Sequence, residues 1–115
     1  MSQYHESEEK LSEETKNFTR ALNSLKEEIE AIDWYQQRVD ATNDENLKEI
    51  LAHNRDEEIE HACMALEWLR RNMPAWDNEL RTYLFTEGNI AHLEEGEAEP
   101  QERGNKSLNI GKLNK

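Results

Sequence analysis

A carboxylate and an imidazole lie in a stripe of residues that otherwise has the spacing of a hydrophobic helix seam. A helix that packs through this stripe would bury Glu58 and His61, and buried charges in proteins are normally paired or bound to metal. The two residues are three apart, which sets both on one helical face, as in bundles whose carboxylates bridge metal ions. The stripe therefore indicates a metal site within a seam. Its members are Leu47, Leu51, Asn54, Glu58, His61, Ala65 and Trp68.

The surrounding sequence predicts an all-α chain that would position these ligands. A first helix is expected over about residues 12–40, where apolar residues recur mostly every seven positions without glycine or proline. After a short turn at 41–43, a second helix is expected over about residues 44–72. Pro74 ends it and can begin a short third helix, to about residue 85. The short turn predicts an antiparallel two-helix hairpin.

The chain divides by composition into four parts. Residues 1–10 are polar and predict a disordered N-terminal tail, followed by a helical half-bundle over 11–93. Residues 94–106 are rich in Glu, Gly, Pro, Gln and Asn and predict an acidic, disordered linker. Apolar residues return in 107–115, as in short segments that dock to a partner at the end of a tether. A chance apolar run in a frayed tail is the alternative.

Charge and composition exclude several classes of protein. The 115 residues carry a net charge of −12, which argues against nucleic acid, whose phosphates require clustered Lys and Arg. No apolar run approaches the roughly 20 residues of a membrane helix, and the acidic N-terminus is unlike a signal peptide. Cys63 is the only cysteine, which excludes an internal disulfide and suits the reducing cytoplasm; we expect it to be buried or half-buried.

Two long helices and a short third cannot cover both hydrophobic seams of the hairpin. Only 35% of the residues are hydrophobic, and small scaffolds without disulfides usually gain stability by oligomerising or binding metal. We therefore expect an obligate homodimer in which two hairpins make a four-helix unit.

The first predicted helix carries a matching carboxylate. Glu28 precedes the turn by nearly as many residues as Glu58 follows it, so Glu28, Glu58 and His61 can converge across an antiparallel hairpin. Each chain would then supply half the ligands of a di-iron bundle site, and a twofold axis would supply the rest. The competing interpretation is chance, because Glu and His three residues apart occur in any acidic helix.

Three further residues surround this constellation. Glu27 and Glu30 are expected to be exposed and could gather hard cations such as calcium at an outer site. Tyr35 lies seven residues after Glu28, on the same helical face, where it can contact the ligands.

These motifs resemble those of encapsulated ferritins, the ferritin-like cargo proteins of encapsulin nanocompartments. The resemblance spans essentially the whole chain and rests on residues 27–35, 52–61, 66–71 and 80–88. It implies a ferritin-like di-iron centre completed by two chains, in dimers that assemble into a ring-shaped decamer. It also implies Glu28, Glu58 and His61 as ferroxidase ligands with Tyr35 close by, and Glu27 and Glu30 as an outer metal-attracting site.

The C-terminal segment is similar to the encapsulin-targeting pattern Ser-Leu-x-Ile-Gly followed by a small polar residue, Leu and Lys. Lys112 and Asn114 depart from that pattern. The resemblance implies docking to the encapsulin shell protein through three aliphatic side chains, Leu108, Ile110 and Leu113.

The function expected from this resemblance is a ferroxidase that oxidises Fe(II) and delivers iron for mineral storage inside a cytoplasmic encapsulin shell. The carboxylate and imidazole donors also accept manganese or zinc, so iron is implied by the resemblance. The alternative is a non-enzymatic helical cargo or adaptor that binds divalent cations and docks to a shell.

Overall fold

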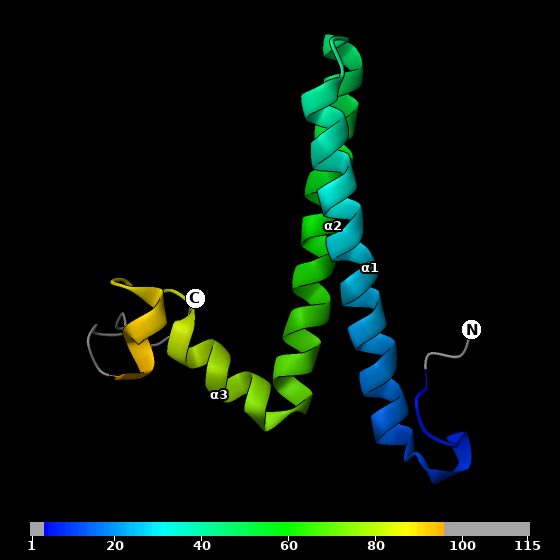
Figure 1. Ribbon diagram of the computed structural model, residues 1–115, viewed down its shortest axis with the longest axis vertical. Coiled ribbons are helices and arrows are strands. Elements are labelled where there is room, and N and C mark those ends of the chain that lie inside the picture. The colour runs from blue at the N-terminus through cyan, green and yellow to red at the C-terminus, as the bar shows by residue number, and fades with distance from the viewer. Residues whose placement is uncertain (1–3, 96–115) are drawn as a thin grey trace. The chain divides into compact units, whose positions relative to one another are not determined.

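The protein is described by a computed structural model over residues 4–95, and this part of the chain is helical without a strand. Two long helices, α1 (Glu13–Ala41) and α2 (Glu45–Asn72), precede the short α3 (Pro74–Tyr83) (Figure 1). Short 3-10 helices lie at Glu8–Lys10 (η1), within the predicted tail, and at Ile90–Glu95 (η2), which spans the end of the predicted helical half-bundle and the first two residues of the predicted linker. The prediction of an all-α hairpin with a short third helix is confirmed.

The helix boundaries follow from local capping. Ser12 caps α1, because its Oγ accepts a hydrogen bond from the backbone N–H of Thr15 at 3.0 Å. Asp44 does the same for α2, where its carboxylate accepts from the N–H of Leu47 at 3.0 Å. Pro74 lies in the first turn of α3, where its missing N–H is not needed.

Helices α1 and α2 pack along one another as an antiparallel hairpin (Figure 1). Near the turn, the Arg55 side chain donates a hydrogen bond to Gln36, and far from the turn Trp68 packs edge-on against Phe18. The two contacts join the helices in reverse sequence order, which is the register expected for equal distances from the turn.

Burial separates two neighbouring stripes on α2. The inner stripe runs in steps of four and three and is wholly or partly buried; it consists of Leu51, Arg55, Glu58, Ala62, Ala65 and Leu69. The open stripe lies beside it and leaves its members 38–58% exposed; it consists of Ile50, His61, Met64 and Trp68. In this unit only Leu69 has a fully buried side chain among the described residues, so one hairpin makes a very small core.

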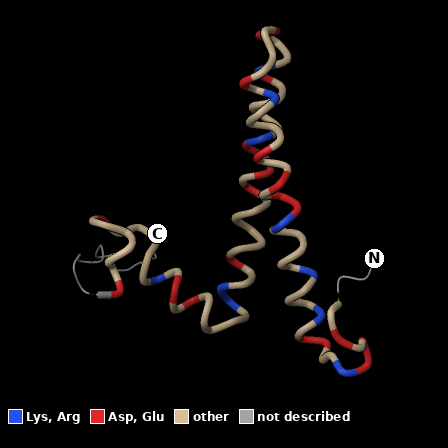
Figure 2. The backbone as a smooth tube through the Cα atoms, viewed as in Figure 1, with Lys and Arg blue, Asp and Glu red and all other residues tan. Residues whose placement is uncertain are grey.

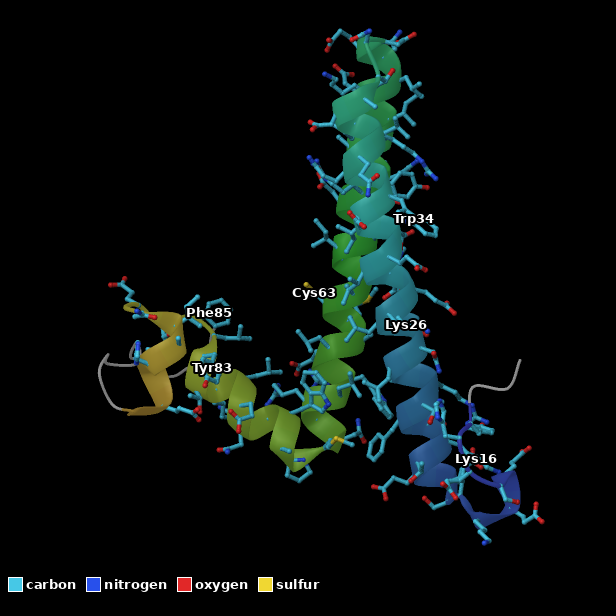
Figure 3. The ribbon with its side chains drawn as sticks, in the orientation of Figure 1. Lys16, Lys26, Trp34, Cys63, Tyr83 and Phe85 are labelled. Atoms are coloured by element: carbon cyan, nitrogen blue, oxygen red, sulfur yellow. The ribbon has the colours of Figure 1, made fainter. Side chains whose placement is uncertain are left out.

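A second compact unit begins at Met73, and α3 packs there against η2. Leu93 of this unit is 8% exposed. We expected α3 to reach about residue 85, but it ends at Tyr83 because Leu84 is extended and Phe85 has a φ of 58°. A left-handed conformation at a bulky residue cannot continue a helix. Phe85, labelled in Figure 3, is also 78% exposed.

None of the helices between residues 4 and 95 is long and apolar enough to cross a membrane.

Candidate metal centre

Three potential metal ligands meet halfway along the hairpin. Glu28 comes from α1, Glu58 and His61 come from α2, and one ligand atom of each lies within 4.8 Å of the others. Bonds from a metal to nitrogen or oxygen are about 2.0–2.2 Å, so two ligands on opposite sides of an ion lie about 4 Å apart. A small side-chain adjustment would therefore let all three reach one ion. Within residues 4–95, no other three His, Cys, Asp or Glu residues come together in this way.

The Glu28 carboxylate favours a cation at this place. Its Oε1 atom is buried and has no hydrogen-bond partner among the described residues. A buried, unpaired carboxylate oxygen is destabilising unless a hydrogen bond or a cation compensates it. The residues present therefore fit a metal ion.

Glu58 and His61 leave their ligand atoms free to bind. The His61 Nδ1 and the Glu58 Oε1 are 3.6 Å apart, which is longer than a hydrogen bond. The Glu58 side chain is 27% exposed and that of His61 is 45% exposed, so this part of the centre opens to the outside of the hairpin. Two carboxylates and one imidazole form a donor set that suits iron, manganese or zinc.

Small residues lie on both helices near the cluster. Ala62 and Ala65 follow His61 on the inner stripe of α2, and Ala21 and Ala31 lie on α1; all four are partly buried.

Acidic residues are also concentrated halfway along the hairpin, at the level of the ligand cluster. Figure 2 shows acidic residues of both helices around the middle of the hairpin. Glu27 and Glu30 are exposed on α1, beside Trp34, which is 50% exposed and labelled in Figure 3. Among the described residues, neither Glu27 nor Glu30 belongs to a group of three potential ligands that could hold one ion.

Tyr35 is partly buried on the same face of α1 as Glu28. The guanidinium carbon of Arg38 lies 5.2 Å from the centre of its ring, within cation–π range.

His53 is exposed, and its Nε2 lies 3.2 Å from the carboxylate of Glu57. Leu108, Ile110 and Leu113 lie outside the described residues.

Arg55 was not predicted as a residue of the site region, and the predicted burial of Cys63 was wrong. Arg55 lies on the inner stripe one turn before Glu58, and its Nη1 donates to the Oε1 of Gln36 at 2.7 Å. The sequence signal for Arg55 was a second stripe on the same helix. This stripe shares every other member with the predicted seam and is shifted by one residue at the members between. Cys63, which we expected to be at least half-buried, is exposed in the single chain.

A hollow of about 440 Å³ on α2 does not hold the three ligands. It lies further toward the end of the helix and is lined by Glu60, Cys63, Met64, Glu67, Trp68 and Arg71. Glu67 accepts hydrogen bonds from Arg70 and Arg71 there, and the bond from Arg70 is the main reason that its pKa falls to about 2. Among the described residues, three potential ligands converge only at Glu28, Glu58 and His61, so this cluster and not the hollow is the candidate metal centre.

An antiparallel hairpin that presents a Glu on one helix and Glu-x-x-His on the other is half of a ferritin-like metal-binding bundle. The family model described as EncFtn-like matches residues 3–87, and the chain belongs to this family of encapsulated ferritins. The resemblance inferred from the sequence is thereby confirmed.

Individual relatives agree with this assignment. A ferritin-like protein of Thermotoga maritima is 58% identical over 111 residues, which cover 96% of this chain and 97% of that protein. An encapsulated ferritin-like protein of Rhodospirillum rubrum is 63% identical over 90 residues, covering 78% of this chain and 64% of that protein. An encapsulin nanocompartment cargo protein of Myxococcus xanthus is 41% identical over 51 residues, covering 44% of this chain and 39% of that protein.

The fold is also similar to one determined by crystallography. The structure of a Nitrosomonas europaea protein matches with a TM-score of 0.74 and 60% sequence identity, over 77% of this chain and 98% of that one. The match therefore includes most of the helical part of the chain.

Proposed function

We propose that this protein is a ferroxidase that oxidises Fe(II) to Fe(III) at a di-iron centre formed between two chains. The observation that carries the proposal is the convergence of Glu28, Glu58 and His61, with one buried Glu28 oxygen that has no hydrogen-bond partner within residues 4–95. Membership of the EncFtn-like family supports iron as the metal.

A second copy of the chain is part of this proposal. One hairpin offers two carboxylates and one imidazole, which is half the ligand set of a ferritin-like site. The partial exposure of His61 and the apolar open stripe beside it suit a partner hairpin placed over the ligands. We propose a homodimer as the active unit and a decameric ring as the assembly of dimers.

Fe(II) is the substrate in this scheme, and the protein holds it for electron transfer. Glu28 and Glu58 offset its charge, while His61 binds through a neutral ring nitrogen and Tyr35 lies on the same side of α1 as Glu28. Two Fe(II) ions release two electrons, which with two protons reduce dioxygen to hydrogen peroxide; peroxide can serve as the acceptor instead. Glu27 and Glu30 would gather cations before they reach the ligands, including calcium, manganese or zinc.

The oxidised iron needs a separate container, and we propose that an encapsulin shell supplies it in the cytoplasm. The similarity to the encapsulated ferritin-like protein of R. rubrum and to the encapsulin cargo protein of M. xanthus supports this partner. Docking would use Leu108, Ile110 and Leu113 of the C-terminal segment. A chain shortened to residues 1–106 should no longer co-purify with an encapsulin shell, while its Fe(II) oxidation remains. Retained co-purification would contradict docking through this segment.

The ferroxidase proposal is tested by the rate at which the purified protein oxidises Fe(II) in air, against a protein-free control. We expect a fast phase that saturates near two iron ions per dimer, the stoichiometry of a site with two metals. A rate equal to buffer from an intact oligomer would reject the ferroxidase.

The same experiment separates the second candidate, a non-enzymatic cargo or adaptor that binds divalent cations. Its support is the donor set itself, which binds redox-inert zinc as well as iron. That protein would bind metal at Glu28, Glu58 and His61 but would leave the oxidation rate at that of buffer.

A further inference from the structure

The proposed centre takes its ligands from both helices, so it exists only in one register of the hairpin. Glu28 would lie about 10 Å from its present height if α1 slipped by one heptad along α2, at 1.5 Å per residue. The inner stripe around the ligands consists largely of Ala and Leu side chains, such as Ala62, Ala65 and Leu69. The short connection at residues 42–44 limits how far α1 can slip, and within that limit hydrophobic packing, which is non-directional, selects a register weakly.

A directional contact joins the helices beside the ligands. The Nη1 of Arg55 donates to the Oε1 of Gln36 at 2.7 Å, from α2 to α1. The Nε of Arg55 also donates to Asp56 at 3.0 Å, which anchors the guanidinium on its own helix and aims its free edge at α1. Arg55 is three residues before Glu58, on the same inner stripe, and its side chain is only 25% exposed.

A heptad slip would break this contact. Residues of α1 and α2 pair in reverse order, so a heptad slip in one direction brings Ile29 opposite the guanidinium, and a slip in the other direction brings Asn43, which lies in the turn outside α1. Ile29 has no side-chain acceptor, and a single polar contact of this kind is known to specify register in helix pairs.

The other cross-helix contact is less selective. Phe18 and Trp68 meet edge-on with ring centres 6.0 Å apart, on the far side of the ligands from the turn. Aromatic rings attract over a range of offsets of about 4.5–7 Å, whereas a short hydrogen bond fails within about 1 Å.

We propose that Arg55 and Gln36 are positioning residues that set the register of α1 against α2 and thereby bring Glu28 to Glu58 and His61. The inference rests on the proposed metal centre and adds residues that are not ligands. Their effect is on the geometry of the ligands, because the guanidinium itself repels a cation.

Cobalt(II) is the probe, because its visible absorption reports a bound ion without turnover. Full-length wild type, Arg55→Met, Gln36→Leu and the double variant would be titrated with Co(II), and circular dichroism would confirm that each is folded. We expect each single variant to bind Co(II) about tenfold more weakly, as for other residues that orient metal ligands. The double variant should be no weaker than the weaker single variant, since both remove the same bond.

The loss of the Arg55 charge and the loss of positioning would change the affinity for Co(II) in opposite directions. Loss of the positive charge of Arg55 alone would strengthen Co(II) binding, so weaker binding reports lost positioning. Gln36→Glu keeps the acceptor oxygen and should bind within about twofold of wild type. Arg20→Met is the matched control, because it removes an arginine of α1 that donates to Glu13 and Asn17 of the same helix; its affinity should not fall.

Folded single variants that bind Co(II) as tightly as wild type, or more tightly, would overturn the positioning role. Losses that add up in the double variant would overturn it too. If Arg55→Met does not fold, Gln36→Leu and Gln36→Glu decide the same question. A wild-type protein that binds no Co(II) would reject the metal centre along with its positioning residues.

Discussion

The inner and open stripes of α2 lie side by side on one helix and differ in their surroundings. Leu51 and Ala65 of the inner stripe are covered by α1, whereas Met64 of the open stripe is 58% exposed. The ligands are divided between them, with Glu58 on the inner stripe and His61 on the open one. One side of the candidate centre is therefore built when the hairpin closes, and the second chain of the proposed dimer would complete the other side.

Removal of either α2 ligand should have the largest effect. Glu58→Ala and His61→Ala should each abolish the fast phase of Fe(II) oxidation, a loss of at least about 100-fold, because the remaining ligands cannot hold the ion. Stopped-flow absorbance in air measures the rate. Glu57→Ala is the control, since this neighbouring carboxylate is 56% exposed and lies beside His53. Normal rates in both ligand variants would disprove the assignment.

A charge on the open stripe should separate the chains. Met64→Glu would place a carboxylate in the apolar contact of the proposed dimer and should weaken association at least about tenfold, because an unpaired charge is costly to bury. Sedimentation velocity at several protein concentrations measures this. Asn46→Glu adds the same charge at an exposed position in the first turn of α2 and should leave association unchanged. A dimer that survives Met64→Glu would exclude the open stripe as its interface.

Exposed carboxylates outside both stripes should matter less. Glu30→Ala should slow Fe(II) oxidation about two- to fivefold at low iron concentration, because an outer carboxylate raises the local concentration of cations. The difference should shrink in high salt, which screens exposed charges. Initial rates at low and high ionic strength measure both effects, with Glu49→Ala as an exposed control. A loss as large as that of Glu58→Ala would make Glu30 a ligand.

The smallest expected effect concerns Glu67, which lies on neither stripe. Arg70 and Arg71 lower its pKa from 4.5 to about 2, so the ionised folded state is favoured above pH 4.5 and this contribution disappears as pH falls toward 2. The side chain is 43% exposed, so solvent screening limits the contribution to about 1 kcal/mol or less.

Urea unfolding of wild type and Glu67→Gln at matched protein concentration checks this contribution. The variant should be less stable at pH 7, and the two curves should converge between pH 4.5 and 2. A difference that is constant across this range would contradict an origin in the ionised carboxylate.

The helix boundaries could be predicted because single residues determine them. Ser12 and Asp44 cap the two long helices, and Pro74 separates α2 from α3. The end of α3 was predicted less well, since nothing in the type of residue at Phe85 indicates a left-handed backbone. The capping residues are local signals, whereas a positive φ at a bulky residue such as Phe85 persists only when the surrounding structure imposes it.

The ligands could be predicted from the sequence, but their neighbours could not. The predicted seam and the inner stripe share Leu51, Glu58 and Ala65, and they differ at the positions between. Because a helix has 3.6 residues per turn, two adjacent stripes can share every seventh residue. Periodicity alone does not say whether His61 or Ala62 lies toward α1. Arg55 was not predicted for the same reason, because this charged residue lies on the inner stripe at a position that the predicted seam did not include.

The buried Glu28 oxygen, unpaired in the part of the chain that the structure describes, would link the stability of the protein to the metal that it binds. An ion held between Glu28 and Glu58 would be a removable cross-link across a loop of about thirty residues, and closing such a loop restricts the unfolded chain. Thermal unfolding with and without Co(II) measures the gain. Without metal the hairpin would open more often and be cut by proteases, so the abundance of the protein would itself follow the supply of iron.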